Sequence, residues 1–388
     1  MPFEHQAAKT RDDHLTGPGP KRILSLDGGG VRALVALAFL ERIEELLREC
    51  RNGDASFRLA DHFDLIGGTS SGAMLAAGLA LGRSVGEIMG FARRLAQRTF
   101  INPHWSRGLL SPKFSSKPFL EELRRIVGDE TLGSPRIRTG LAIVAKRLDT
   151  ASPWVFHNNP RGRYYNGITG GRSRANRDLP LHEILHASAA APTYFEPERI
   201  SVADGVDGLF VDGGISPYNN PALLLFLMAT TSSYGYAWPA GENQLSLISV
   251  GTGSGGPLRR SEALERLPSA LLAAVSLESI MADCNWQAQG VLQWLGACSE
   301  PWPIDAEAGD CNEHGALPMR LLHYQRYNLL FDPDWFNSEL GIATTVEEIA
   351  HFSRLDGAEA AEQLLELARR AAARQVKIEH VLPESMAA

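Results

Sequence analysis

A serine between two glycines stands where a short apolar run meets a helical pattern. Residues 68–72 read Gly68-Thr69-Ser70-Ser71-Gly72 and fit G-x-S-x-G, a strained strand-to-helix turn that presents a serine hydroxyl as a nucleophile. Gly68 and Gly72 leave room where side chains would collide across the turn. The motif also occurs by chance in glycine-rich loops, but its flanking strand and helix patterns favour Ser70 as the nucleophile. Ser71 is then expected to cap the helix and to direct its backbone N–H at an oxyanion.

Three successive glycines form a second strand-to-helix turn in SLDGGGVRA, residues 25–33. The spacing satisfies G-x-G-x-x-A, so a dinucleotide-binding turn is one interpretation, with Asp54 at a suitable distance for a ribose contact. Asp54 does not close a clear strand, however, and the sequence has no Walker lysine that would make a P-loop. We favour a nest of backbone N–H groups that faces Ser70 as an oxyanion hole. Its glycines are Gly28, Gly29 and Gly30.

A carboxylate ends the strand pattern in FVDGG, residues 210–214. Asp-Gly is common at turns, so an Asx-turn is the purely structural alternative for Asp212. A serine needs a proton acceptor when it attacks an acyl carbon, and a carboxylate at the carboxyl end of a strand in the same sheet suits that role. Asp212 is therefore the candidate general base for Ser70.

Late histidines leave a Ser–His–Asp hydrolase open, because the chain order Ser…Asp…His can be completed after Asp212. None of these histidines sits in a recognisable catalytic loop, and we expect each to be a surface or internally satisfied side chain. They are His314, His323 and His351. A lipid- or nucleotide-binding module with a disabled site is a further alternative. The joint presence of the serine, the carboxylate and the glycine loop argues against it.

The charge balance limits the classes of partner. With 38 basic and 45 acidic residues the formal charge is −7, which argues against a nucleic-acid polymer held by a broad basic surface. The apolar run at 222–229 is far shorter than the roughly 20 residues of a spanning helix, and the polar N-terminus lacks the apolar region of a secretory signal. Four scattered cysteines indicate reduced thiols and no zinc site, which favours a cytoplasmic location. They are Cys50, Cys284, Cys298 and Cys311.

Strand and helix patterns alternate along residues 21–256, which predicts an α/β fold with a mainly parallel sheet and helices on its faces. The expected strands are 22–26, 62–68, 139–148, 153–158, 208–214 and 244–253. The expected helices are 31–50, 71–82, 84–98, 116–127, 179–192 and 220–231. Beyond residue 256 the pattern is mainly helical, with one further strand expected at 321–331.

The order DGGGVR, GTSSG and DGG resembles the patatin-like phospholipases. The segments ASAAAPTYFEP at 187–197 and SLISVGTG at 246–253 extend this resemblance over residues 22–256. Ala33 stands where many family members have glycine, and beyond residue 256 only YQRYN is similar to relatives. The resemblance implies a three-layer α/β/α sandwich. It also implies hydrolysis of an acyl ester of a phospholipid or related lipid through an acyl-serine intermediate, with no metal and no cofactor.

Position by position, the resemblance implies Ser70 as nucleophile and Asp212 as its partner in a dyad that lacks a histidine. The glycine loop looks like the oxyanion hole, and Arg32 occupies the conserved basic place just beyond it. The expected oxyanion-hole residues are Gly28, Gly29, Gly30, Arg32 and Ser71, and the elbow glycines are Gly68 and Gly72.

We expect a single domain in three parts: a flexible arm at 1–20, a patatin-like catalytic core at 21–256 and a mainly helical part at 257–388. A lipid ester substrate implies peripheral membrane contact, and residues 100–114 suit either a membrane-facing lid or a plain surface loop. Some bacterial patatin-like relatives are effectors held inactive until a cyclic nucleotide or partner protein binds. Residues 257–388 therefore leave a homodimer interface and a small-molecule activator open.

Overall fold

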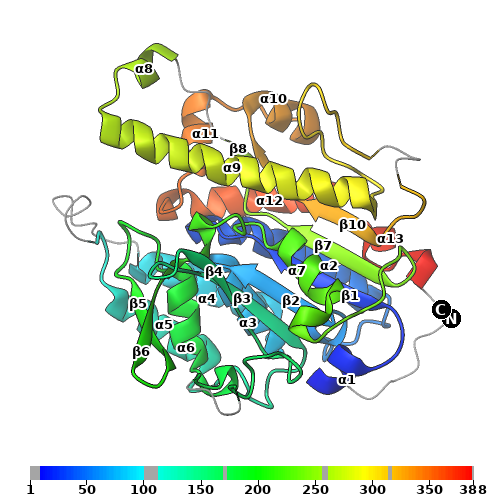
Figure 1. Cartoon of the computed structure of the whole chain (residues 1–388). Coiled ribbons are helices and arrows are strands. Elements are labelled where there is room, and N and C mark those ends of the chain that lie inside the picture. The colour runs from blue at the N-terminus through cyan, green and yellow to red at the C-terminus, as the bar shows by residue number, and fades with distance from the viewer. Residues whose placement is uncertain (1–8, 100–111, 169–172, 256–260, 313–316, 387–388) are drawn as a thin grey trace.

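A mostly parallel sheet forms the centre of a computed structural model, which describes residues 9–99, 112–168, 173–255, 261–312 and 317–386 (Figure 1). Within these residues the sheet has nine strands in the order β5-β6-β3-β2-β1-β7-β10-β9, with β4 also paired to β3. The strands are β1 (Lys21–Leu26), β2 (Leu65–Thr69), β3 (Gly140–Arg147), β4 (Ser152–His157), β5 (Glu198–Ala203), β6 (Val206–Asp212), β7 (Leu245–Val250), β9 (Gly296–Ala297) and β10 (Leu322–Tyr327). A separate short pair joins β8 (Ser254–Gly255) to β11 (Leu330–Phe331).

The direction of each strand follows the connection that precedes it. Strands β3, β2, β1, β7, β10 and β9 run parallel to their neighbours in this series, whereas β4, β5 and β6 pair antiparallel. A helical crossover separates β1 from β2, while short turns link β3 to β4 and β5 to β6, as the two pairing modes require. The predicted mainly parallel sheet is confirmed. The sequence did not predict β5, whose alternation of apolar residues is weak.

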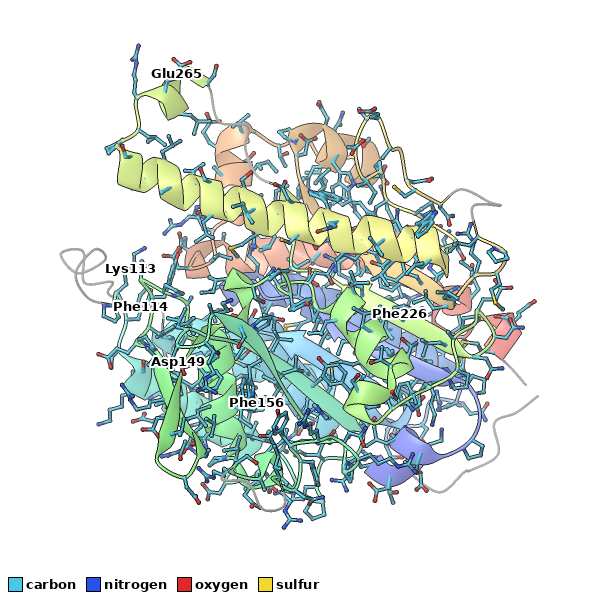
Figure 2. All side chains as sticks on the ribbon, viewed as in Figure 1. Lys113, Phe114, Asp149, Phe156, Phe226 and Glu265 are labelled. Carbon is cyan, nitrogen blue, oxygen red and sulfur yellow. The ribbon has the colours of Figure 1, made fainter. Side chains whose placement is uncertain are left out.

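Helices cover both faces of the sheet, which confirms the three-layer sandwich. Successive strand residues point to opposite faces, so Leu24 joins one hydrophobic cluster and Ile23 the other. Phe156 lies in the first cluster and Phe226 in the second (Figure 2). The first face carries α2 (Ala33–Glu49), α3 (Ser71–Ala80), α4 (Val85–Thr99), α5 (Ser116–Val127), α6 (Leu181–Ala189), α11 (Val346–Phe352), α12 (Ala361–Gln375) and α13 (Ile378–Val381). The second face carries α7 (Ala222–Thr230) and the C-terminal end of α9 (Ser269–Leu295).

The described part of the N-terminal arm packs on the sheet, unlike the loose arm expected from the sequence. Helix α1 (Arg11–Thr16) buries His14 and Leu15. His14 Nδ1 lies 2.8 Å from Asp64 Oδ1, and Trp238 Nε1 donates to the Leu15 carbonyl at 3.0 Å. The polar composition of the arm gave no sign of this packing, which depends on two buried side chains, His14 and Leu15, and on hydrogen bonds to their backbone carbonyls.

The chain beyond residue 256 adds to the same layers. β10 pairs with β7, and α12 packs against α2. The short helices α8 (Ser261–Glu265) and α10 (Pro333–Trp335) precede α9 and α11 respectively. In the described part of the chain no helix is long and apolar enough to cross a bilayer, although α9 has 27 residues. The sequence leaves residues 100–114 open as a membrane-facing lid or a plain surface loop, and most of them, residues 100–111, lie outside the described residues.

Candidate active site

Ser70 occupies a sharp turn between β2 and α3. Its backbone has φ 55° and ψ −124°, a region that non-glycine residues adopt only when surrounding contacts enforce it. Those contacts come from α6 and β3: the Ser70 N–H donates to Ser188 Oγ at 2.9 Å, and the Ser188 hydroxyl donates to the Val144 carbonyl at 2.6 Å. Ser188 therefore fixes the strained turn to the centre of the sheet.

The two glycines of the turn allow backbone segments to touch. A Cβ atom at Gly68 would collide with the backbone of Gly72, and one at Gly72 would collide with the carbonyl oxygens of Leu26 and Asp27. Both clashes are with backbone, which cannot rotate away as a flexible side chain can. The first turn of α3 consequently packs directly on the carboxyl end of β1.

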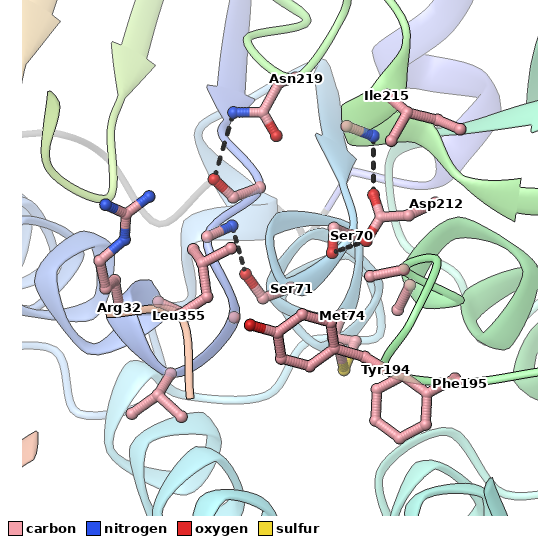
Figure 3. Close-up of a pocket in the computed structure, with 18 of the residues that line it drawn as sticks. Arg32, Ser70, Ser71, Met74, Tyr194, Phe195, Asp212, Ile215, Asn219 and Leu355 are labelled. Atoms are coloured by element: carbon pink, nitrogen blue, oxygen red, sulfur yellow. Dashed lines mark hydrogen bonds between the residues drawn. The ribbon is translucent and has the colours of Figure 1, made fainter. Parts of the chain in front are cut away.

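The sheet topology brings Asp212 to Ser70. Ala145 of β3 pairs with β4 and with Asp212 of β6, while Val144 pairs with β4 and with Thr69 of β2. A strand has only two edges and β4 occupies one of them, so β2 and β6 share the other edge of β3. They approach from opposite directions, and their carboxyl ends meet. The Ser70 hydroxyl donates to Asp212 Oδ2 at 2.6 Å (Figure 3).

Asp212 is buried and accepts two hydrogen bonds. Its Oδ1 accepts from the Gly214 N–H at 2.7 Å and its Oδ2 accepts from Ser70. The bond to Gly214 is the Asx-turn considered as the structural alternative, so one carboxylate serves both the turn and the serine. Burial raises the pKa of Asp212 to about 6, against the opposing effect of these two hydrogen bonds. The carboxylate is thus a stronger proton acceptor than an exposed aspartate.

The glycine loop is tied to the turn by a side chain. The Gly29 N–H donates to Ser71 Oγ at 3.0 Å. This differs from the expected capping role, because Ser71 is the first residue of α3 and its hydroxyl bonds the neighbouring loop. Gly30 has φ +58°, and a Cβ atom there would collide with the Leu355 carbonyl oxygen. All three loop glycines line the same cavity as Ser70 and Asp212.

Arg32 lines the cavity, but its guanidinium is turned away from Ser70 (Figure 3). Its Nη1 donates to the Ser353 carbonyl at 3.2 Å. The Arg32 guanidinium carbon also lies over the Phe331 ring, 5.5 Å from the ring centroid. Burial lowers the pKa of Arg32 to about 10, so the side chain remains a cation at neutral pH. These contacts attach the loop to the C-terminal third of the chain.

A cavity of about 380 Å³ opens beside Ser70. One wall is polar and holds the serine, the carboxylate and the glycine loop. The apolar wall is formed by Met74, Leu75, Phe91, Ala92, Leu95, Ala96, Phe119 and Phe195. Leu277 and Met281 of α9 and Leu355 also border the space. The site can therefore hold a long apolar group with a polar reacting centre at one end.

Within the described residues, the alternative sites left open by the sequence are not assembled. No histidine is among the described residues that line the cavity. His323 is buried on β10, where burial lowers its pKa to about 4, and His351 is half-exposed on α11. His314 lies outside the described residues. Asp54 follows α2, about 25 Å along that helix from the glycine loop, too far for the proposed ribose contact.

Sequence reasoning missed Ser188, Asn219 and Thr252. Ser188 lies within ASAAAPTYFEP, a segment whose composition gives no sign that its serine contacts the Ser70 turn. Asn219 and Thr252 hold the glycine loop, and their types are too common in loops to signal this. Among the described residues, no group of three or more His, Cys, Asp and Glu side chains is arranged to hold a metal ion.

Sequence comparisons relate the chain to known proteins. The model of the family described as patatin-like phospholipase matches residues 24–226. Patatin-2-Kuras 4 of Solanum tuberosum is 29% identical over 279 residues, covering 64% of this chain and 70% of that protein. The cGAMP-activated phospholipase of Vibrio cholerae is 32% identical over 213 residues, covering 52% of this chain and 56% of that enzyme. Human GIVD cytosolic phospholipase A2 aligns structurally with a TM-score of 0.47 at 12% identity, covering 97% of this chain and 61% of that one.

Proposed function

The chain belongs to the patatin-like phospholipase family, and on this premise we propose that it hydrolyses acyl esters of phospholipids or related lipids. The observation that carries the proposal is the 2.6 Å hydrogen bond from Ser70 Oγ to Asp212 Oδ2 at the polar wall of an otherwise apolar cavity. A nucleophile with its proton acceptor at one end of an apolar space suits the carbonyl group of a bound acyl chain.

The proposed reaction has two halves. Ser70 Oγ attacks the acyl carbon while its proton passes to Asp212 Oδ2, and the carbonyl oxygen becomes an oxyanion. Collapse breaks the ester bond, and the leaving alkoxide takes the proton from Asp212, so that lysolipid departs and an acyl-serine remains. A water molecule then attacks the acyl carbon with Asp212 again accepting the proton. The second collapse returns that proton to Ser70 and releases the fatty acid.

We assign stabilisation of the oxyanion to backbone N–H groups. The α3 N-terminus places the Ser71 N–H beside Ser70. The glycine loop adds the Gly30 N–H as a second donor, because the Gly28 and Gly29 N–H groups already donate to the Asn219 carbonyl and to Ser71 Oγ. The bond from the Gly29 N–H to Ser71 Oγ keeps the loop in register with the turn. Arg32 contributes by holding the loop against Ser353, since its guanidinium faces that carbonyl.

The test of the proposed function is product analysis on a lipid panel. The full chain is incubated with phosphatidylcholine, phosphatidylethanolamine, phosphatidylglycerol, a galactolipid and a triacylglycerol, and fatty acid and lysolipid are quantified by mass spectrometry. We expect equal amounts of the two products from at least one phospholipid and a fluorophosphonate adduct on Ser70. Release of no fatty acid from any lipid, together with an unmodified Ser70, would contradict the proposal.

We further propose that the N-terminal half of α9 contacts the membrane that holds the substrate. Residues 269–281 read SALLAAVSLESIM, with one charged side chain, and Leu272 and Ile280 are 44% and 57% exposed. The same helix borders the cavity through Leu277 and Met281, so one helical segment carries both exposed apolar side chains and side chains that line the cavity. An apolar helix surface of this kind partitions into the boundary between lipid head groups and acyl chains.

Charge introduced on this surface is expected to impair hydrolysis of vesicles alone. We predict that Leu272→Asp with Ile280→Asp lowers the rate on phosphatidylglycerol vesicles about tenfold or more, while hydrolysis of a monomeric short-chain ester changes less than about twofold. Leu227→Asp is the matched control, because Leu227 is 43% exposed on α7 and does not line the cavity. Equal loss on both substrates, or equal loss in the control, would contradict membrane contact by α9.

Activation by a small molecule is a second candidate function. It is favoured by the 32% identity to the cGAMP-activated phospholipase of Vibrio cholerae. The test compares fatty acid release with and without cGAMP and related cyclic dinucleotides. A high basal rate that none of them changes would contradict it.

The homodimer stays a prediction, which sedimentation equilibrium of the full chain checks.

A further inference from the structure

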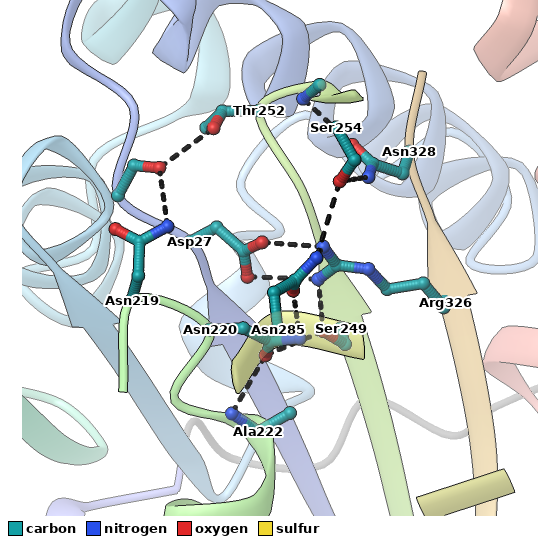
Figure 4. A network of polar contacts seen from close by, with 12 residues as sticks. Asp27, Asn219, Asn220, Ala222, Ser249, Thr252, Ser254, Asn285, Arg326 and Asn328 are labelled. Atoms are coloured by element: carbon teal, nitrogen blue, oxygen red, sulfur yellow. Dashed lines mark hydrogen bonds and ion pairs between the residues drawn. The ribbon is translucent and has the colours of Figure 1, made fainter. Parts of the chain in front are cut away.

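We propose that Arg326 is a positioning residue that holds the glycine loop beside Ser70 through its ion pair with Asp27. Arg326 lies on β10 and Asp27 directly follows β1, with β7 between those strands. Its Nη1 and Nη2 donate to the two Asp27 carboxylate oxygens at 2.9 and 2.5 Å (Figure 4). The inference rests on the proposed function, because it assigns a role within that reaction.

The ion pair between Arg326 and Asp27 crosses β7, the strand between β10 and β1. Arg326 Nη1 also donates to Ser249 Oγ of β7 at 2.6 Å, and Nη2 lies 3.5 Å from Asn285 Oδ1 of α9. A planar guanidinium satisfies several acceptors at fixed angles, which a lysine ammonium on a flexible chain does not reproduce. Figure 4 shows the guanidinium and the carboxylate facing each other across the ends of these strands. The network therefore sets both the position and the plane of the Asp27 carboxylate.

The position of Asp27 determines that of the loop, because the next peptide is held on both sides. The Gly28 N–H donates to the Asn219 carbonyl at 3.1 Å, and the Gly28 carbonyl accepts from Thr252 Oγ1 at 2.9 Å. Asn219 Nδ2 also donates to that carbonyl at 3.3 Å. On its other side, the Asp27 carbonyl oxygen packs against Gly72 of α3. A shift of Asp27 would move the loop and the start of α3, which both border the reacting centre.

A stabilising role alone explains this buried pair poorly. Removing two charges from water costs much of what their attraction returns, and apolar side chains of similar volume often stabilise such a position better. Burial raises the pKa of Asp27, while the Arg326 guanidinium opposes that rise. What apolar side chains cannot supply is a fixed geometry for the carboxylate that begins the glycine loop. Positioning is therefore the function that the charged pair adds.

The experiment compares Arg326→Met, Arg326→Lys and wild type with a monomeric short-chain ester. We expect Arg326→Met to lower kcat about 100-fold with KM changed less than about threefold, and Arg326→Lys to restore part of the loss. A fatty acyl trifluoromethyl ketone forms an anionic tetrahedral adduct with a serine, so its affinity should fall with kcat. The affinity for an ether lipid, which has no carbonyl, should stay unchanged. Asp64→Asn is the matched control, because it disturbs a buried pair with His14 at the end of β2 that lies away from Ser70.

Two outcomes would overturn the proposal. One is a kcat and ketone affinity in Arg326→Met within about threefold of Asp64→Asn. The other is an equal loss of ketone and ether lipid affinity, which indicates general damage. Hydrogen–deuterium exchange of the peptide spanning residues 24–33 gives a readout that does not need activity: it should rise in Arg326→Met and not in Asp64→Asn. An inactive wild type with that exchange pattern would contradict the proposed function and leave the positioning role supported.

Discussion

Replacing Ser70 with alanine is expected to lower the rate of lipid ester hydrolysis by about 10⁴-fold or more. The variant loses the nucleophile, and the oxyanion donors and the cavity that remain give only a small fraction of the acceleration. Asp212→Asn should lower kcat about 10³-fold or more, because an amide cannot accept the Ser70 proton. The asparagine fits the same space and can still bond Gly214, so the loss reports proton transfer and not the turn.

Initial rates with a monomeric ester measure both losses, and a fluorophosphonate probe should label wild type but not Ser70→Ala. His323→Gln and His351→Gln are the controls, since neither ring lines the cavity. A loss of several orders of magnitude in a histidine variant would overturn the dyad in favour of a Ser–His–Asp enzyme. An Asp212→Asn variant that retains a tenth or more of the wild-type kcat would also overturn the dyad, because Asp212 would then not be the essential proton acceptor.

Local patterns predicted most elements of the sheet and the identity of the candidate pair. The apolar runs of β1, β2, β3 and β7 are buried on both faces and therefore read clearly as core strands. The glycine spacing around Ser70 and the carboxylate at the end of β6 were likewise visible, because turns with severe steric demands restrict the residue types that fit. Each of these signals lies within about ten residues of chain.

Contacts between distant segments could not be predicted in this way. Ser70 and Asp212 are 142 residues apart, and Asp27 and Arg326 are 299 residues apart. Nothing in FVDGG indicates that β6 will pair antiparallel with β3, on the same edge as β2 and directly beyond the end of β2. Burial of α1 was missed for the same reason, since its partners Asp64 and Trp238 are remote in sequence. The sequence could propose the reacting groups, whereas only the topology brings them together.

Hydrolysis is expected to weaken as Asp212 gains a proton. Burial raises its pKa to about 6, and only the ionised carboxylate accepts the Ser70 proton. With a soluble ester, kcat/KM should therefore be constant above pH 7 and about tenfold lower at pH 5, falling with unit slope. A profile that stays flat between pH 5 and pH 8 would contradict Asp212 as the base.

The same pKa predicts that Asp212 destabilises the fold at the pH values where its carboxylate is ionised and can act as the base. An aspartate ordinarily titrates near 3.8 and the folded protein holds this one at about 6, so folding favours the protonated form. As far as Asp212 is concerned, the free energy of unfolding is highest below the pKa of the unfolded chain. It declines as the pH rises through about 6, the pKa in the folded protein. The loss at pH 8 amounts to about 3 kcal/mol.

Asp212→Asn keeps the neutral form at every pH and should be more stable than wild type at pH 8 by up to about this amount. Urea unfolding at pH 8 and pH 4 measures the difference, which should nearly vanish at pH 4; an Asn variant less stable than wild type at pH 8 would contradict the raised pKa.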